Sequence, residues 1–174
     1  MEIETLAIRE ERRADCAVIR SLNLAAFGRS AEGALVDALR LNGGVLLSLV
    51  ATLGERIVGH ILYTPVSIIN DDKETVGAGL GPMAVLPELQ RTGVGSRLMR
   101  AGNEQLKKRG FPFIVVLGHP EYYPRFGFRP ASANGIRCTW NVPNEAFMML
   151  SLDESRTKAI SGLAKYRDEF SKVV

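Results

Sequence analysis

The sequence predicts an α/β protein, a single domain over residues 1–174 in which helices flank a central mixed, mostly antiparallel sheet. Two observations favour this fold class. Apolar runs of strand length, separated by short polar turns, fill residues 46–86 and are typical of antiparallel hairpins. A strand, a long helix and a second strand then follow within residues 75–117, which forms a βαβ unit and adds one parallel pair. A chain of 174 residues can bury a sizeable core.

Composition narrows the class of protein. Hydrophobic residues make up 46% and charged residues 24%, as in soluble globular proteins, and no apolar run approaches the roughly 20 residues that span a bilayer. The acidic start, Met1–Glu4, lacks the order of a signal peptide. Cys16 and Cys138 form no disulfide framework or metal pattern. We therefore expect a cytoplasmic protein without a metal, and the net charge of +3 gives no reason to expect nucleic acid.

The first elements follow from periodicity. We expect a strand over Glu4–Arg9 and a helix over Arg12–Phe27, then a second helix over Ala31–Leu41 that stops at Asn42-Gly43-Gly44. Helical spacing predicts that the first helix buries the side formed by Ala14, Val18, Leu22 and Ala25.

Three strands should come next. Leu46–Leu53 and Ile57–Ile69 form a hairpin, and Pro65 predicts a bulge or an exposed edge in its second strand. The third strand, Thr75–Leu86, contains several poor strand formers, namely Gly77, Gly79, Gly81 and Pro82. This composition predicts a distorted strand whose backbone is approached closely.

The second half begins with the clearest helix, Thr92–Arg109, whose expected buried stripe is Val94, Leu98, Ala101 and Gly102. The run Phe113–Leu117 is typical of a strand buried on both faces. We expect a last strand over Phe147–Leu152. We then expect an amphipathic helix, or a helix and tail, over Asp153–Val174. Its predicted docking side is Ile160, Leu163, Tyr166 and Phe170.

A glycine-rich turn lies between the third of these strands and the clearest helix. Gly93 and Gly95 let the backbone from Gln90 to Ser96 curl tightly and leave its N–H groups open, and a helix N-terminus aims at the same spot. Such a turn is typical of an anion site, most often for phosphate. Two familiar phosphate loops are excluded, because neither G-x-x-x-x-G-K-[S/T] nor G-x-G-x-x-G with a later acidic residue occurs.

What remains is Q-x-x-G-x-G, formed by Gln90, Gly93 and Gly95, and it resembles the pyrophosphate loop of the GNAT superfamily of N-acetyltransferases. A second stretch, 118–128, predicts a short helix ended by Gly127. Its pattern aromatic-Tyr-x-x-aromatic-Gly-Phe resembles a signature of the same family. The resemblance covers about residues 46–130 and implies the GNAT fold with acetyl-CoA as co-substrate.

The resemblance implies a set of cofactor contacts. Backbone amides of about Arg91 to Ser96 would hold the pyrophosphate, Gln90 would shape the loop, and backbone groups of Met83 and Val85 would pair with the pantetheine arm. Arg91 or Arg97 is a candidate for the 3′-phosphate. The full expected set is Met83, Ala84, Val85, Gln90, Arg91, Thr92, Gly93, Val94, Gly95, Ser96, Tyr122 and Phe126.

The resemblance also implies the chemistry. Tyr123 takes the place of the tyrosine that in many members protonates the departing thiolate, while the general base stays open between a carboxylate and His60, each through water. The expected reaction is acetyl transfer to a primary amine by direct attack in a ternary complex. A non-catalytic CoA-binding module and a nucleotide-binding protein remain alternatives.

The acceptor is not selected by the sequence. The resemblance places the first two helices on the acceptor side, with Phe27, Arg29 and Glu32 near its opening. Cys138-Thr139-Trp140 is either a short strand or a wall of the acceptor pocket, and Cys138 has no identifiable base to make it a nucleophile. Dimers are common in the family, which leaves a homodimer open.

Overall fold

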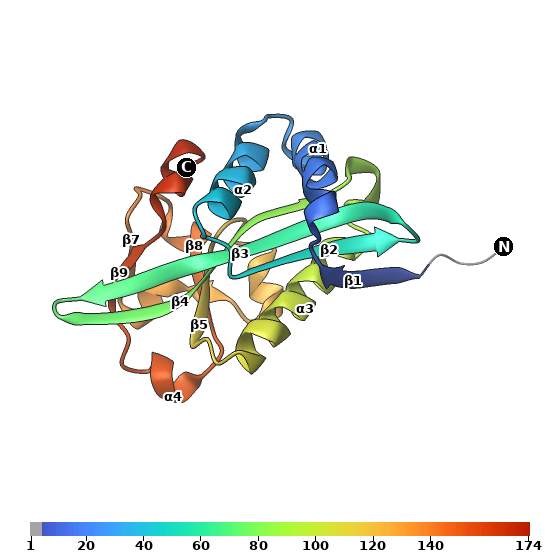
Figure 1. The fold of residues 1–174 in the computed structure, drawn as a ribbon. Coiled ribbons are helices and arrows are strands. Elements are labelled where there is room, and N and C mark those ends of the chain that lie inside the picture. The colour runs from blue at the N-terminus through green and yellow to red at the C-terminus, as the bar shows by residue number, and fades with distance from the viewer. Residues whose placement is uncertain (1–4) are drawn as a thin grey trace.

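The computed structural model describes residues 5–174, so the acidic start Met1–Glu4 lies outside the described residues. The chain forms a twisted mixed sheet with helices on both faces (Figure 1). The strands are β1 (Leu6–Glu10), β2 (Leu47–Leu53), β3 (Arg56–Asn70), β4 (Lys73–Val85), β5 (Phe113–Leu117), β6 (Arg129–Pro130), β7 (Ile136–Cys138), β8 (Phe147–Ser151) and β9 (Gly162–Lys165). The helices are α1 (Cys16–Phe27), α2 (Ala31–Leu41), α3 (Val94–Lys108) and α4 (Glu154–Thr157).

The sheet confirms the predicted topology. Its order is β1-β2-β3-β4-β5-β8-β6, all antiparallel except for the β4–β5 pair, which the α3 crossover makes parallel. One feature was not expected: β9 pairs with the far half of β3, and β7 pairs in parallel with β9. The chain after β8 therefore extends the sheet.

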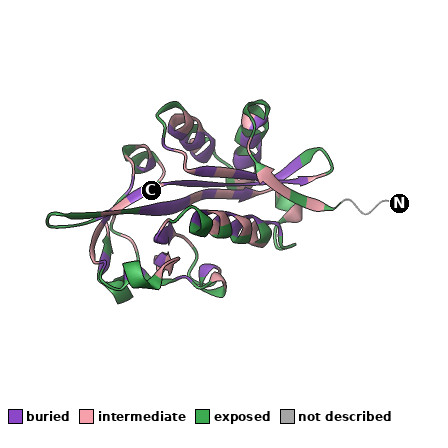
Figure 2. Ribbon diagram, turned by 60° about the horizontal axis from the view of Figure 1, so that its bottom comes forward, coloured by how far each residue is buried: buried purple, intermediate pink, exposed green. Residues whose placement is uncertain are grey.

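The core lies in two layers, one on each side of the sheet, as Figure 2 shows with the sheet seen nearly edge-on. Successive residues of β5 alternate between them: Phe113 and Val115 join the layer under α1 and α2, whereas Ile114 and Val116 join the layer under α3. This alternation is the period of two that a strand imposes on its side chains. The predicted burial of Phe113–Leu117 on both faces follows from it.

Two buried stripes differ from the prediction. Helix α1 buries Ile19, Leu22 and Asn23, while Val18 is exposed. A short 3₁₀ turn over Arg13–Asp15 precedes the helix, and the helix packs on the sheet with a different side from the predicted one. The predicted side formed by Ala14, Val18, Leu22 and Ala25 is therefore wrong except for Leu22. Helix α3 buries Val94, Leu98 and Gly102 as expected, leaves the predicted Ala101 half-buried, and also buries Met99 and Leu106.

The distortion predicted for the third strand is confirmed. The β3–β4 register shifts between Ile61 and Tyr63, opposite the stretch from Leu80 to Met83. Pro65 lies in the part of β3 between its last residue paired to β2, Tyr63, and its first residue paired to β9, Ser67. A proline without an N–H fits this gap, so the edge predicted there is present and the bulge lies a few residues earlier.

The helix predicted over Asp153–Val174 is wrong. Only Glu154–Thr157 is helical, and the strand β9 and a 3₁₀ turn over Asp168–Lys172 follow. Gly162, with φ of 131°, enters β9 in a backbone conformation that side chains rarely adopt, and a Cβ there would collide with the Ile69 carbonyl. The predicted docking residues are nevertheless inward: Ile160, Tyr166 and Phe170 are buried and Leu163 is half-buried.

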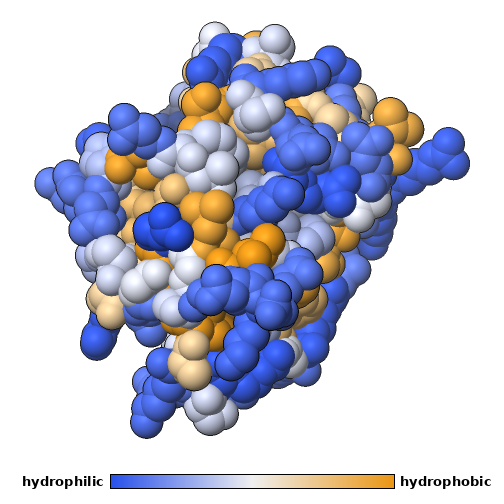
Figure 3. All heavy atoms as spheres, turned by 90° about the vertical axis from the view of Figure 1, so that its left-hand side faces the viewer, coloured by the Kyte–Doolittle hydropathy of each residue, from blue (hydrophilic) through white to orange (hydrophobic). Residues whose placement is uncertain are grey.

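The surface at the end where the β3–β4 hairpin projects mixes apolar and hydrophilic residues, with apolar side chains gathered near its middle (Figure 3). Ile69 and Val76 on this hairpin are among the exposed large apolar residues of the described chain. None of the helices in residues 5–174 has the length and apolar character needed to cross a membrane.

Candidate functional site

The site begins where β4 and β5 part. They pair only at Ala78, Gly79 and Leu80, after which β4 continues beside β3 and β5 continues beside β8. Leu86 N–H donates to Val58 O, so the alternation of antiparallel bonds turns the backbone groups of Ala84 toward β3. The same alternation turns those of Met83 and Val85 toward the opening between β4 and β5.

The glycine turn lies at the end of this opening. Gln90 donates from Nε2 to Val85 O at 3.2 Å, and the Thr92 hydroxyl donates to Leu89 O at 2.6 Å, so both side chains fold the turn onto the end of β4. The first bond of α3 runs from Arg97 N to Gly93 O, at 3.1 Å. Within residues 5–174 the backbone N–H groups of residues 91–96 have no hydrogen-bond acceptor in the chain.

The conformation of this turn explains its glycine. Gly93 has φ of 97°, and a Cβ there would meet no atom within 4 Å. The turn therefore has open space above it, and its six unpaired N–H groups lie at the positive end of the α3 dipole. Unpaired N–H groups at the N-terminus of a helix are suited to bind a phosphate-bearing ligand.

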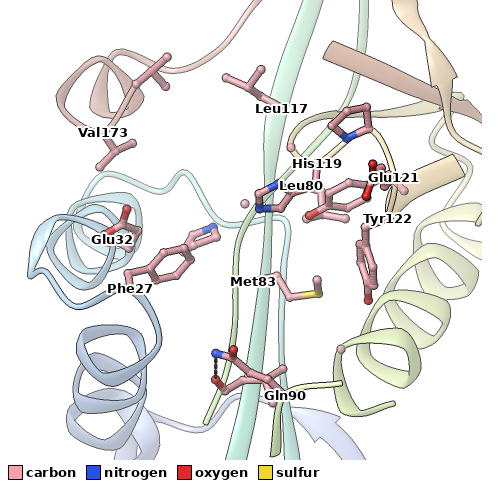
Figure 4. Close-up of a pocket in the computed structure, with 18 of the residues that line it drawn as sticks. Phe27, Glu32, Leu80, Met83, Gln90, Leu117, His119, Glu121, Tyr122 and Val173 are labelled. Carbon is pink, nitrogen blue, oxygen red and sulfur yellow. Dashed lines mark hydrogen bonds between the residues drawn. The ribbon is translucent and has the colours of Figure 1, made fainter. Parts of the chain in front are cut away.

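A cavity of about 1340 Å³ runs from this turn through the opening between β4 and β5 (Figure 4). In Figure 4 Phe27 and Glu32 reach it from the α1–α2 side, whereas His119 and Tyr122 face them from the opposite side and Met83 lies between. Because α1 and α2 cover one face of the sheet and α3 the other, the cavity joins the two faces.

Nine of the thirteen predicted site residues line this cavity: Met83, Val85, Gln90, Arg91, Gly93, Gly95, Ser96, Tyr122 and Tyr123. The other four do not line it. Ala84 is buried and its backbone groups face β3, and Val94, the first residue of α3, is buried in the core layer between α3 and the sheet. Thr92 folds back onto Leu89, and Phe126 packs behind Tyr122 with ring centroids 5.2 Å apart. Arg97 is exposed and also outside the lining, which leaves Arg91 as the candidate of the two at the cavity.

The second motif forms a compact aromatic group. The 3₁₀ turn Tyr123–Phe126 ends at Gly127 in the left-handed conformation, as predicted. The ring of Tyr123 lies edge-on to Tyr122 at 5.2 Å and packs closely over Gly118, where any larger residue would collide with it. The Arg125 guanidinium lies 4.7 Å above the Tyr122 ring. These contacts fix both tyrosines at the cavity wall.

Tyr123 keeps its proton in this position. Its side chain is only 8% exposed, and burial together with the nearby Tyr122 raises the pKa of Tyr123 well above its ordinary value of 10. At neutral pH it is therefore a neutral phenol that can donate a proton.

His60, a candidate for the base, lies away from the cavity. It is fully buried, with Nε2 at 2.9 Å from the Ser48 hydroxyl and 3.7 Å from the Glu11 carboxylate. Burial lowers the pKa of His60, against the opposing effect of Glu11. The titratable side chains that do line the cavity besides its tyrosines and arginines are Glu32, His119 and Glu121.

The cavity also includes residues that sequence reasoning assigned elsewhere. Trp140, Tyr166 and Phe170 line it from the segment after β6, together with Val173 and Val174. The sequence predicts that Trp140 is in a short strand or a pocket wall, but it predicts a helix for Tyr166 and Phe170, and this helix is not formed. The aromatic side chains of Trp140, Tyr166 and Phe170 are the one signal in the sequence that could have indicated this part of the cavity wall. In the described residues, no group of three or more His, Cys, Asp and Glu side chains is arranged to hold a metal.

These features define an α/β protein with a phosphate-type loop at the mouth of a cleft between two parted strands. The acetyltransferase (GNAT) domain family matches residues 8–131, and the chain belongs to this family of acetyltransferases.

Two similar proteins that match most of this chain support the same family. YhbS of Escherichia coli strain K12, an uncharacterized N-acetyltransferase, is 32% identical over 96% of this chain and 99% of its own length. YjhQ of the same organism, also an uncharacterized N-acetyltransferase, is 38% identical over 80% of this chain and 81% of its own length.

Two crystal structures are similar. That of YhbS in complex with CoA has a TM-score of 0.93 and 30% identity, covering 100% of this chain and 96% of that one. A GNAT family acetyltransferase from Brucella melitensis in complex with acetyl-CoA has a TM-score of 0.80 and 35% identity, covering 96% and 99%. The GNAT fold expected from the two motifs is therefore confirmed.

Proposed function

We propose that this protein is an N-acetyltransferase that moves the acetyl group of acetyl-CoA to a primary amine by direct attack in a ternary complex. The observation that carries the proposal is the row of unpaired N–H groups at residues 91–96, at the mouth of a cleft that Tyr123 lines. The CoA and acetyl-CoA complexes of the two similar proteins support the choice of co-substrate.

The loop supplies binding and orientation. The N–H groups of residues 91–96 and the α3 dipole would hold the pyrophosphate, and Arg91 is the cation at the cavity suited to the 3′-phosphate. Beyond Leu80, β4 no longer pairs with β5, so the backbone groups of Met83 and Val85 have no partner strand on that side. They would pair with the pantetheine arm instead. The thioester carbonyl would then lie within the opening, polarised by backbone N–H groups.

Transfer needs two proton movements. The amine nitrogen forms a bond to the acetyl carbon while the carbon–sulfur bond breaks, and the departing sulfur takes the phenolic proton of Tyr123. The proton that the amine loses passes to water in the open cavity, with His119, Glu121 and Glu32 as the nearby acceptors that line it. Tyr123 regains a proton from the same water and is restored for the next turnover.

Calorimetric titration with acetyl-CoA, with ATP and NAD as controls, tests the co-substrate. Selective micromolar binding of acetyl-CoA is expected, followed by thiol release with an amine panel. Equal binding of all three ligands, or none, would remove the basis for the transferase. Binding without thiol release for every amine would favour a non-catalytic CoA-binding module. A cytoplasmic location and a homodimer stay predictions.

A further inference from the structure

The part of the cavity on the α1–α2 side is chemically different from the loop part. We call it the aromatic end and define it by Phe27, Glu32, Trp140, Tyr166 and Phe170, all of which line the cavity. The proposed contacts to acetyl-CoA use none of these residues. Figure 4 shows Phe27 pointing into this end from α1, with Glu32 beside it.

Three of these rings form one continuous wall. The centroids of Trp140 and Tyr166 are 5.0 Å apart, and those of Tyr166 and Phe170 are 5.2 Å apart. Such tilted contacts fix the rings against one another, and all three rings line the cavity. The Tyr166 side chain is 7% exposed, and its hydroxyl has no hydrogen-bond partner in the described chain.

The wall adjoins the proposed reaction centre. A Cβ at Gly79 would lie 2.9 Å from the Tyr166 ring, and one at Gly81 would lie 3.8 Å from the Phe170 ring. Both glycines belong to β4 at the point where it leaves β5, two to four residues before Met83. A group resting on the wall therefore lies next to the opening proposed for the thioester.

Glu32 is the carboxylate at this end of the cavity, and Arg29 forms an ion pair with it. It is 5% exposed, and Arg29 donates to both of its oxygens, from Nε at 2.9 and 3.2 Å and from Nη2 at 2.5 Å. A carboxylate has about four acceptor positions, so Glu32 retains room for another donor. The cations of the cavity, Arg91 and Arg125, line it together with the residues of the loop and the Tyr122 motif. The cavity thus offers a carboxylate to an amine at one end and cations to phosphates at the other.

We propose that the aromatic end is the acceptor subsite, and that it takes a small primary amine attached through a short chain to a flat aromatic ring. The ring lies on the wall formed by Trp140, Tyr166 and Phe170, and Glu32 attracts the ammonium group into the cavity. The ammonium releases its proton to water before the nitrogen attacks the acetyl carbon. This assignment rests on the proposed function and specifies its acceptor.

A ligand panel tests it on the full chain. Phenethylamine and tryptamine are compared with 2-cyclohexylethylamine, which lacks the flat ring, with spermidine, and with an alanine-rich tripeptide carrying a free N-terminus. We expect kcat/KM for the two arylalkylamines to exceed that for the others at least tenfold, and phenethylamine to bind the CoA-loaded protein in calorimetry. A preference for spermidine or the tripeptide, or absence of phenethylamine binding, would overturn the proposal.

Variants separate this proposal from the transferase itself. Glu32→Gln should raise the KM for phenethylamine at least tenfold and leave the Kd for acetyl-CoA within twofold, whereas Glu104→Gln, which alters an exposed paired carboxylate on α3, should change neither. Trp140→Leu should erase the preference for phenethylamine over 2-cyclohexylethylamine. Unchanged KM in Glu32→Gln together with unchanged preference in Trp140→Leu would refute the subsite. If the unaltered protein does not bind acetyl-CoA, the proposed function is refuted, and the acceptor subsite with it.

Discussion

The Tyr122 hydroxyl lies 3.2 Å from the position that a Cβ on Gly95 would occupy. This contact joins the glycine turn at the start of α3 to the aromatic motif after β5, more than twenty residues later in the chain. Met83 of β4 approaches the same spot, with its sulfur and methyl carbon at 3.6 Å. The two motifs that identify the family therefore meet at one point of the cavity.

The closeness of Gly95 and Tyr122 leads to a first prediction. Gly95→Val should displace the Tyr122 ring into the cavity and raise the Kd for acetyl-CoA at least tenfold, as measured by calorimetry. The combined variant Gly95→Val with Tyr122→Ala should bind more tightly than Gly95→Val with Tyr122 intact, because the obstructing ring is gone. Additive losses in the double-mutant cycle would contradict the contact.

The open space above Gly93 leads to a second prediction. Gly93→Glu places a bulky anion where the phosphates would lie, so acetyl-CoA binding should be abolished. Because φ of 97° is strained for any side chain, Gly93→Ala serves as the control for strain and should keep more affinity than Gly93→Glu. Undiminished binding by Gly93→Glu would falsify the loop assignment.

Tyr123→Phe removes only the proton donor. We expect kcat to fall by about 10²-fold, the lower end of the effect of a positioned acid, with the Kd for acetyl-CoA near normal. Tyr122→Phe is the matched control, because Tyr122 lines the same cavity and should keep most of its kcat. Equal turnover of Tyr123→Phe and the unaltered enzyme would make Tyr123 structural.

A partly buried carboxylate away from the cavity, that of Glu11, predicts pH-dependent stability. Desolvation acts to raise the pKa of Glu11, but the nearby His60 and the hydrogen bonds from Arg40 and Ser48 outweigh it and lower the pKa to about 2. The pKa of Glu11 in the folded state is thus below its ordinary value of 4.5, and its contribution to stability is present above pH 4.5 and lost as pH falls toward 2. A shift of this size corresponds to about 3 kcal/mol.

His60 acts in the same direction in a higher pH window. Burial lowers its pKa below 6.5, so its contribution is full above pH 6.5 and declines as pH falls further. We expect the free energy of unfolding, from urea titrations, to decrease steadily from pH 7 to pH 3. Glu11→Gln should flatten the curve below pH 4.5, whereas Glu145→Gln, an exposed control, should not. A slope unchanged by Glu11→Gln would exclude this network as its source.

Much of the fold was predictable because its signals are local. The hairpin strands, the α3 helix and its glycine turn are each encoded within a few residues, by apolar period and by the backbone freedom of Gly93. The same holds for the short turn that ends at Gly127. Nine of the site residues predicted from these local signals line one cavity in the structure.

Other features of the site and the fold depend on contacts between distant segments. The backbone groups of Met83 and Val85 face the opening, whereas those of Ala84 between them face β3. Which of these residues face β3 depends on the register between β4 and β3, and neither strand alone contains that information. The side of α1 that is buried likewise depends on how the helix lies on the sheet, which is why Ile19 is buried and Val18 is exposed.

By itself the sequence determined the class of fold, the phosphate-type loop and the two motifs, because short-range stereochemistry controls turns and strand periodicity. Only the tertiary structure decided which residues form the aromatic end of the cavity. Residues 160–170 carry apolar spacing that suits a helix, but pairing of β9 with β3 and β7 satisfies their backbone groups in a sheet instead. That long-range pairing brings Tyr166 and Phe170 to the cavity, which Glu32 and Phe27 of the first two helices also line.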